Sequence, residues 1–256
     1  MVSTKYNMKR NLGQNFLIDK NVALREISYA NISKNDIILE IGPGKGILTT
    51  LLADKANKVI AIEIDKNIFN NLEGKFPKNV ELINKDALDV DFSSLPDFNK
   101  IVSNLPYQIS SPITFKFLDY NFELAVLIYQ KEFANRMVAS FGSKDYSRLS
   151  VGVYFKAECE ILEIVPRTSF SPEPKIDSCV VKMVKRKSPP FDVIDEPFFF
   201  ELTKNLFNHR RKKLKNILNM FYNVNNKIPF LDKRIEELTP EQIGNLSNIL
   251  FRNLSV

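Results

Sequence analysis

The sequence lacks the features that mark several large classes of proteins. No apolar run approaches the roughly 18 residues needed to cross a bilayer, and residues 1–10 are polar where a signal peptide would carry an apolar segment. We therefore expect a soluble, cytoplasmic protein. Its two cysteines, Cys159 and Cys179, are far apart and lack metal-ligand spacing, so we expect buried free thiols and neither a disulfide framework nor a zinc site.

Charge of either sign is not in large excess. The 256 residues include 36 Lys and Arg against 30 Asp and Glu, a net charge of +6 that favours polyanionic partners only weakly. The distribution of the cations is more informative than their number. They cluster near the N-terminus (Lys5, Lys9, Arg10), around a late strand (Lys182, Lys185, Arg186, Lys187) and in one predicted helix (Arg210, Arg211, Lys212, Lys213, Lys215).

Up to about residue 130, short apolar strands alternate with helical patterns, without internal repeats or low-complexity segments. This alternation predicts an α/β, Rossmann-like fold with a mainly parallel sheet and helices on both faces. Two late segments have no crossover helix between them, so they should add an antiparallel pair at the sheet edge and bring the sheet to seven strands. The expected strands are residues 37–41, 58–65, 80–84, 100–104, 123–130, 148–165 and 178–185, with a helix over 45–55.

A second, helical domain is expected after the Ser188-Pro189-Pro190 stretch. We therefore divide the chain into a cofactor-binding domain, residues 1–187, and a small C-terminal helical domain, residues 188–256. Thr239 should cap the last helix, with Pro240 at its first position. A helix is also expected over 201–220, with one apolar stripe formed by Leu202, Leu206, Leu214, Ile217, Leu218 and Phe221.

A glycine-rich segment, residues 40–46 (EIGPGKG), follows the first strand and precedes a helix. Its glycines allow a sharp turn and a close approach of the backbone to a ligand, at the edge where open α/β sheets bind ligands. Ile47 stands where a dinucleotide site has glycine, and Gly46 stands where a P-loop has Ser or Thr after its lysine. Glu40 disfavours a phosphate cradle and favours a cofactor that carries positive charge.

Two acids follow the next two strands. Glu63 lies about 20 residues beyond the glycines, where a carboxylate accepts hydrogen bonds from both hydroxyls of a ribose. Asp86 follows the third strand, where it can accept a hydrogen bond from the amine of an adenine. Each acid alone is equally consistent with a solvated strand end, but the glycine loop and both acids together predict a nucleoside cofactor.

The segment Asn104-Leu105-Pro106-Tyr107 follows the fourth strand at the same edge of the sheet. The amine of adenine is a weak nucleophile, because its lone pair is delocalised into the ring. The Asn104 side-chain oxygen and a backbone carbonyl near Leu105 or Pro106 can hold its N–H groups in line with a methyl donor. Tyr107 offers a ring face on which the base can stack. A sulfonium is a good leaving group, so the sole histidine, His209, is not needed as a base.

Three prolines, Pro166, Pro172 and Pro174, predict a stiff, extended loop before the last strand. Phe170 in this loop has two interpretations that the sequence leaves open. It is either an anchor packed on the core or a second stacking surface for a base flipped into the site.

These motifs resemble the small-subunit ribosomal RNA adenine N6,N6-dimethyltransferases, the family known in bacteria for kasugamycin sensitivity, from Lys9 to the last helix. The matching segments are residues 12–19 (LGQNFLID), 40–46, 104–107, 170–178 and 208–212, together with Glu63 and Asp86. Residues 108–112 (QISSP) are closest to archaeal members. Lys85 departs from the family, which usually has glycine before the aspartate.

The resemblance implies a class I methyltransferase fold, S-adenosylmethionine as cofactor, and dimethylation of two adjacent adenosines in a hairpin loop near the 3′ end of small-subunit rRNA, with a role in subunit biogenesis. An unpaired loop suits this chemistry, because its bases are readily splayed out. The implied adenine-holding residues are Asn104, Leu105, Pro106, Tyr107 and Phe170. The implied cofactor contacts are Gln14, Asn15, Leu17, Gly42, Gly44, Glu63, Ile64, Asp86, Ala87 and Asn104. The implied RNA contacts are Arg210, Arg211, Lys212 and Lys213.

Alternatives stay open at this point. A methyltransferase of large-subunit rRNA that confers macrolide resistance shares the fold and the chemistry, although it more often has isoleucine in place of Leu105. A DNA adenine methyltransferase is disfavoured, because the helical domain shows no base-reading motif. A non-catalytic ribosome-assembly factor is disfavoured by the intact motifs. The expected partner is the small ribosomal subunit precursor, bound by a monomer without a metal or membrane contact.

Overall fold

The computed structural model describes residues 15–222 and 228–254. The chain separates into two compact units, Met1–Ala134 with Cys159–Lys185 and Asn135–Glu158 with Arg186–Val256. The second break lies close to the expected end of the first domain at residue 187. Residues 135–158 differ from the expectation, because they group with the second unit.

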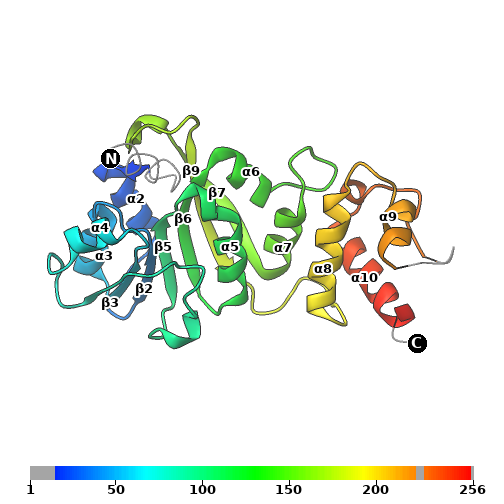
Figure 1. The fold of residues 1–256 in the computed structure, drawn as a ribbon, viewed down its shortest axis with the longest axis horizontal. Coiled ribbons are helices and arrows are strands. Elements are labelled where there is room, and N and C mark those ends of the chain that lie inside the picture. The colour runs from blue at the N-terminus through cyan, green and yellow to red at the C-terminus, as the bar shows by residue number, and fades with distance from the viewer. Residues whose placement is uncertain (1–14, 223–227, 255–256) are drawn as a thin grey trace, which may run out of the picture. The chain divides into compact units, whose positions relative to one another are not determined.

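The first unit contains, within its described residues, a seven-stranded sheet in the order β4-β3-β2-β5-β6-β9-β7 (Figure 1). Its strands from β4 to β6 pair in parallel, and β9 runs antiparallel to β6. This arrangement confirms the predicted Rossmann-like α/β fold. The strands are β2 (Ile37–Ile41), β3 (Lys58–Ile62), β4 (Val80–Ile83), β5 (Lys100–Asn104), β6 (Leu124–Gln130), β7 (Ala157–Val165) and β9 (Ser178–Lys185).

Helices cover both faces of this sheet. On one face α2 (Lys20–Ala30) and α3 (Ile47–Lys55) pack on each other and on the strands, in a core cluster that includes Ile128 of β6. The next residue, Tyr129, points to the opposite face, because successive side chains of a strand alternate. There its hydroxyl lies 2.6 Å from the hydroxyl of Thr114 on α5 (Ser110–Asp119). The shorter helices α4 (Lys66–Leu72) and α6 (Lys131–Met137) also begin in this unit.

A small second sheet joins the start of the described chain to the proline-rich loop. Strand β1 (Phe16–Leu17) pairs antiparallel with β8 (Phe170–Ser171), and Leu17 is the partner of Phe170. The amide of Ile18 also donates to the carbonyl of Ser169 (2.9 Å), in the short 3-10 turn η3 (Arg167–Ser169). These contacts place the N-terminal segment beside the loop that sequence analysis singled out.

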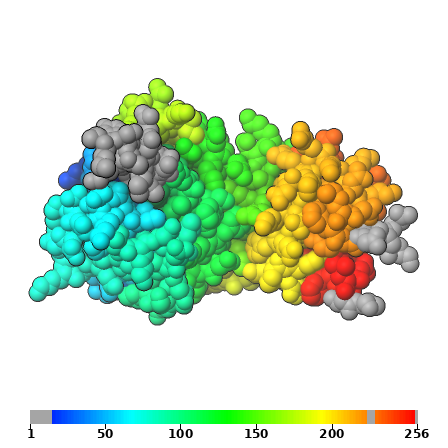
Figure 2. All heavy atoms as spheres, in the orientation of Figure 1, coloured from blue at the N-terminus to red at the C-terminus, as the bar shows by residue number. Residues whose placement is uncertain are grey.

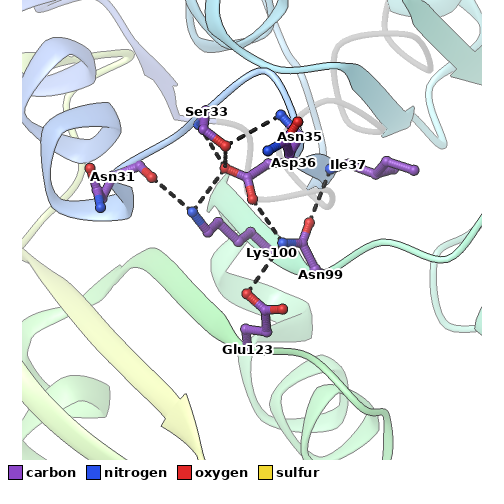
Figure 3. A network of polar contacts seen from close by, with 8 residues as sticks. All are labelled: Asn31, Ser33, Asn35, Asp36, Ile37, Asn99, Lys100 and Glu123. Atoms are coloured by element: carbon purple, nitrogen blue, oxygen red, sulfur yellow. Dashed lines mark hydrogen bonds and ion pairs between the residues drawn. The ribbon is translucent and has the colours of Figure 1, made fainter.

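A polar network ties the amino ends of β2 and β5 to the end of α2 (Figure 3). The ammonium of Lys100 donates to the carboxylate of Asp36 (2.9 Å) and to the carbonyl of Asn31 (2.8 Å). The amide of Asn99 donates to Asp36 (2.8 Å), while its oxygen accepts from the amide of Ile37 (3.0 Å). Lys100 and Asp36 are both buried, and each charge is compensated by the other. The pair lies at the edge of the sheet opposite the glycine-rich loop.

The second unit is helical and has its own apolar core. Its helices are α7 (Arg148–Lys156), α8 (Glu196–Asn208), α9 (Leu214–Phe221) and α10 (Pro240–Leu254), with the 3-10 turn η4 (Ile235–Glu237). Thr239 caps α10 as expected, because its hydroxyl accepts from the amide of Gln242 (3.3 Å) and its own amide donates back to the Gln242 side chain (3.1 Å). None of the helices within residues 15–222 and 228–254 combines the length and the apolar composition of a membrane-spanning segment.

The prediction of one long strand over residues 148–165 was wrong in its first half. Residues 148–156 form α7, and only 157–165 form β7. The amide of Ser147 donates to the Ser150 hydroxyl (3.0 Å) at the start of α7. Val151 and Phe155 are then buried in the core of the second unit with residues such as Phe199. Tertiary packing of these β-branched and aromatic residues therefore overrides their preference for strands.

The prediction of one helix over residues 201–220 was also wrong, because α8 ends at Asn208 and α9 begins at Leu214. The basic run lies in the connection between them. There the Arg210 guanidinium pairs with Glu236 (2.6 Å), and the Lys213 backbone forms an isolated bridge with Arg234. These contacts turn the chain out of the helix. Five members of the predicted apolar stripe are nevertheless buried, whereas Phe221 is 44% exposed.

Both cysteines are free, as expected, but they differ in burial. Cys179 is buried, whereas Cys159 is partly exposed. Burial is the main cause that raises the pKa of each thiol, to about 12 for Cys159. Neither thiol is therefore a reactive thiolate at neutral pH.

Candidate functional site

A cavity opens at the carboxyl ends of β2, β3, β4 and β5, with about 1020 Å³ of empty space that is continuous with solvent. Nearly all of the site residues predicted in the first unit line it. They are Asn15, Leu17, Gly42, Gly44, Glu63, Ile64, Asp86, Ala87, Asn104, Leu105, Pro106 and Tyr107. Gln14 and the first cationic cluster, Lys5, Lys9 and Arg10, lie outside the described residues.

The glycine-rich loop is shaped by close approaches that a side chain would obstruct. Gly42 has a φ of 70°, and a Cβ there would lie 3.2 Å from Cγ of Pro106. Gly44 has a φ of 58°, and a Cβ there would lie 2.8 Å from the ring of Phe16. The loop therefore packs against both the Asn104–Tyr107 segment and β1, and glycine is required at each approach.

Two buried carboxyl groups, those of Glu40 and Glu63, line this cavity. Glu40 is 2% exposed, and burial, which outweighs the nearby Thr49 hydroxyl, raises its pKa to about 8. One of its carboxyl oxygens has no hydrogen-bond partner in the described part of the chain. Glu63 is 4% exposed, and burial raises its pKa, although it accepts a hydrogen bond from the amide of Asp65 (2.9 Å). This lining is suited to a ligand that brings hydrogen-bond donors and positive charge.

The third acid is fixed by its own loop. A carboxylate oxygen of Asp86 accepts from the amide of Leu88 (2.9 Å), and the Asp86 carbonyl accepts from the amide of Asp89 (3.0 Å). Lys85, the departure from the family pattern, is exposed and also lines the cavity. Its long side chain reaches solvent, so the loop accommodates it without closing the site.

Asn104 presents an unpaired acceptor at the end of β5. Its amide nitrogen donates to the carbonyl of Asn15 (3.3 Å), whereas its Oδ1 is buried without a partner among the described residues. The carbonyl of Pro106 already accepts from the amide of Ile109 (3.1 Å). The Leu105 carbonyl makes no hydrogen bond within the described ranges. The two acceptors left for a ligand are therefore Asn104 Oδ1 and the Leu105 carbonyl.

Tyr107 lines the cavity, and its hydroxyl forms a hydrogen bond with a residue of β9. Its hydroxyl lies 2.7 Å from the hydroxyl of Ser178, the buried first residue of β9. Burial raises the pKa of Tyr107, so the hydroxyl is neutral. Sequence analysis missed Ser178 as a partner, because no local pattern connects residues 71 positions apart.

Phe170 is the predicted site residue that the structure separates from the cavity. It is 2% exposed and belongs to the core cluster that also contains Leu17 and Val165. It is not among the described residues that line the cavity. Of the two interpretations left open, this geometry matches the anchor packed on the core.

Several residues that line the cavity were not predicted as site residues. Phe16 belongs to the 12–19 motif, so its neighbours in the sequence were a usable signal. The apolar walls Ile47, Leu48, Ile62 and Ile68 resemble any other core position in the sequence. In the described ranges no group of three or more His, Cys, Asp and Glu is placed to hold a metal ion.

Comparison with known proteins agrees with these motifs. Residues 5–251 match the family model described as "Ribosomal RNA adenine dimethylase". The "Probable ribosomal RNA small subunit methyltransferase A" of Methanosarcina acetivorans is 49% identical, over 98% of this chain and 97% of that protein. The protein of the same name from Methanococcus maripaludis is 44% identical, over 96% of this chain and 97% of its own length.

Solved structures show the same likeness. A dimethyladenosine transferase from Plasmodium falciparum superposes with a TM-score of 0.79 and 29% identity, over 94% of this chain and 98% of that one. The 23S rRNA methyltransferase ErmE superposes with a TM-score of 0.66 and 28% identity, over 93% of this chain and all of that one. The family model spans nearly the whole chain, and this protein therefore belongs to the ribosomal RNA adenine dimethylase family.

Proposed function

We propose that this protein uses S-adenosylmethionine to dimethylate the N6 amines of two adjacent adenosines in the 3′-terminal hairpin loop of small-subunit rRNA, in the course of small-subunit biogenesis. Its family membership makes it an rRNA adenine dimethyltransferase. The observation that carries the proposal is the pair of unpaired acceptors, Asn104 Oδ1 and the Leu105 carbonyl, beside the cavity that Glu40, Glu63 and Asp86 line.

The residues that line the cavity fit S-adenosylmethionine. When bound, this cofactor supplies a methyl group activated by its sulfonium charge. Glu63 would accept hydrogen bonds from the ribose hydroxyls of the cofactor and Asp86 from its adenine amine; each acid lines the cavity and follows the end of its strand. Glu40 and Asn15 also line the cavity. Burial keeps Glu40 protonated at neutral pH, and the positive charge of the methionine ammonium or the sulfonium would favour its ionised form.

The catalytic segment positions the target amine. In the first transfer Asn104 Oδ1 and the Leu105 carbonyl would accept the two N–H groups of the amine, which localises the nitrogen lone pair and aims it at the methyl carbon. The monomethylated amine has one N–H left, which one of these acceptors would hold in the second transfer; each transfer releases one proton from the nitrogen. Pro106 fixes the backbone so that the Leu105 carbonyl keeps this direction. The ring of Tyr107, tethered through its hydroxyl to Ser178, stacks on the base. Phe170 supports this arrangement from the core by anchoring the β1–β8 pair.

The second unit supplies cations for the RNA backbone. The basic connection between α8 and α9 lies in the orange region at the surface of that unit (Figure 2). Arg210 and Lys213 are already paired with Glu236 and Asp232. Arg211 and Lys212 are exposed and have no carboxylate partner among the described residues, so they are available for phosphates.

The test is methyl transfer from labelled S-adenosylmethionine to undermethylated small and large ribosomal subunits. We expect dimethyladenosine in small-subunit rRNA and a loss on the order of a hundredfold or more in Asn104→Ala. Asn67→Ala, an exposed asparagine on α4 that does not line the cavity, is the matched control and should keep the wild-type rate.

Large-subunit rRNA is the alternative substrate, favoured by the likeness to ErmE. Label found in the large subunit alone would establish that function instead. Label in neither subunit, with the cofactor still bound, would overturn both and point to a non-catalytic assembly factor. Sedimentation of the purified protein tests the monomer that we propose as the acting species.

A further inference from the structure

The loop that follows β4 is held by a lysine from another element. The ammonium of Lys116 on α5 donates to the carbonyls of Ala87 (3.0 Å), Leu88 (2.7 Å) and Val90 (2.5 Å). These residues lie 26 to 29 positions earlier in the chain. All three donor positions of an ammonium are therefore used on one loop.

Packing and charge keep the ammonium in this position. Its Nζ lies 4.5 Å from the centroid of the Phe92 ring, which is buried just after the loop. Lys116 is partly buried, which lowers its pKa, while Asp89, Asp91 and Asp86 oppose this effect. An ammonium so surrounded by acceptors and acids stays charged and holds its geometry.

The held loop is the one that delivers Asp86 and Ala87 to the cavity. Asp86 lines the cavity, and its carboxylate is oriented by a hydrogen bond from the amide of Leu88. The carbonyl of the same Leu88 accepts from Lys116. Helix α5 begins at Ser110, directly after the catalytic segment and its turn η2 (Tyr107–Ile109). Lys116 thus connects the helix that follows the catalytic segment to the loop proposed to bind the cofactor's adenine.

We propose that Lys116 is a positioning residue for the adenosine half of the cofactor, acting through the loop that carries Asp86 and Ala87. This inference rests on the proposed function, since it takes S-adenosylmethionine as the ligand of the cavity. Lys116 does not line the cavity among the described residues, so its effect is on the loop and not on the ligand directly. Its loss should weaken cofactor binding and leave the transfer step intact once the cofactor is saturating.

The experiment compares Lys116→Met, which keeps the aliphatic stem over Phe92, with Lys116→Arg and with Lys34→Met. Lys34 is the matched control, because its ammonium also donates to a backbone carbonyl, that of Asp54 (2.7 Å), without contacting the cavity loops. Calorimetry gives the Kd for S-adenosylmethionine and for 5′-deoxy-5′-methylthioadenosine, which has the adenosine half alone. For Lys116→Met we expect both Kd values to rise on the order of tenfold, which corresponds to about 1.4 kcal/mol. The kcat at saturating cofactor should be unchanged, Lys116→Arg should recover part of the affinity, and Lys34→Met should match wild type.

A double-mutant cycle with Asp86→Ala tests the route of the effect. If Lys116 acts by orienting Asp86, adding Lys116→Met to Asp86→Ala should cost little further affinity. Fully additive losses, or a Lys116→Met protein that binds both ligands as wild type does, would overturn the inference. A wild-type protein that binds neither ligand would instead overturn the proposed function, so the two failures are distinguishable.

Discussion

Replacing Glu26 with leucine should stabilise this protein, and the gain should grow as the pH rises. Glu26 lies on α2 with 0% exposure, among core residues such as Val22 and Ile27. Neither of its carboxyl oxygens has a hydrogen-bond partner in the described residues. A buried polar group without a partner costs about 1–3 kcal/mol, and an apolar side chain of similar volume removes that cost. We therefore expect a gain of about 2 kcal/mol even where the carboxyl is neutral.

The pH dependence follows from the same burial. Burial, followed by the negative charges of Glu40 and Glu163, raises the pKa of Glu26 well above its ordinary 4.5. Above that ordinary value the folded protein keeps a proton that the unfolded chain releases, so the stability of the wild type falls with rising pH. Each such proton corresponds to about 1.4 kcal/mol per pH unit. Glu40, with a pKa of about 8, holds a second such proton in the folded protein. Because one of these protons is removed, the stability of Glu26→Leu should fall less steeply with rising pH than that of the wild type.

Urea unfolding followed by far-ultraviolet circular dichroism measures both effects, since the chain has no tryptophan for fluorescence. Measurements near pH 5 and near pH 7 span the window above the ordinary pKa. Glu26→Gln is the control, because it removes the proton and keeps an unpartnered polar group. It should flatten the pH dependence without the apolar gain. The reasoning is refuted if Glu26→Leu is less stable than wild type at both pH values, or if its stability depends on pH as steeply as that of the wild type.

Three further predictions concern the two ends of the sheet and the RNA surface. Burial raises the pKa of Asp36, but hydrogen bonds, including those from Asn99 and Lys100, outweigh it and lower this pKa to about 2. The ionised Asp36 therefore stabilises the fold above its ordinary pKa of 3.8, and this contribution is lost as the pH falls through 2. Asp36→Asn should lower the free energy of unfolding by about 3 kcal/mol at neutral pH. An unchanged urea midpoint would show that the Asp36–Lys100 ion pair does not stabilise the fold. Tyr107→Phe and Ser178→Ala should each raise the KM for RNA several-fold at unchanged cofactor affinity, and the double variant should be no worse; additive effects would show that the two hydroxyls act separately. Arg211→Gln and Lys212→Gln should each lower the slope of log Kd against log salt by about 1 in a filter-binding titration, while the exposed Arg252→Gln should not; equal slopes for all three would remove this surface from the RNA interface.

Much of the first unit follows from patterns that are local in the sequence. The predicted strands at residues 37–41, 100–104 and 178–185 match β2, β5 and β9 residue for residue. Buried strands bounded by glycine, proline and polar residues carry their own signal. That the glycine-rich loop and the Asn104–Tyr107 segment line one cavity was predictable for a related reason. Parallel strands bring their carboxyl ends to one edge, so motifs at strand ends meet without knowledge of any single contact.

The misassigned segments share a physical cause. Residues 148–156 combine β-branched and aromatic side chains that fit either a strand or a buried helix, and the core around Phe199 decides for α7. Residues 209–213 continue a helical pattern, yet the ion pair of Arg210 with Glu236 and the contact of Lys213 with Arg234 turn the chain. In both cases the deciding partners lie more than 20 residues away, beyond the reach of periodicity.

The sequence by itself determined the fold class, the position of the cavity proposed to bind the cofactor and the residue types of the proposed catalytic segment, because these depend on the types of residues at strand ends. Tertiary structure alone decided which polar atoms are left without partners. It buried Phe170 in the core, tied Tyr107 to Ser178, left the buried Glu26 carboxyl without a hydrogen-bond partner among the described residues and placed the Lys116 ammonium on three carbonyls of a distant loop. The physical reason is that hydrogen bonding and burial are properties of neighbours in space, and long-range packing chooses those neighbours.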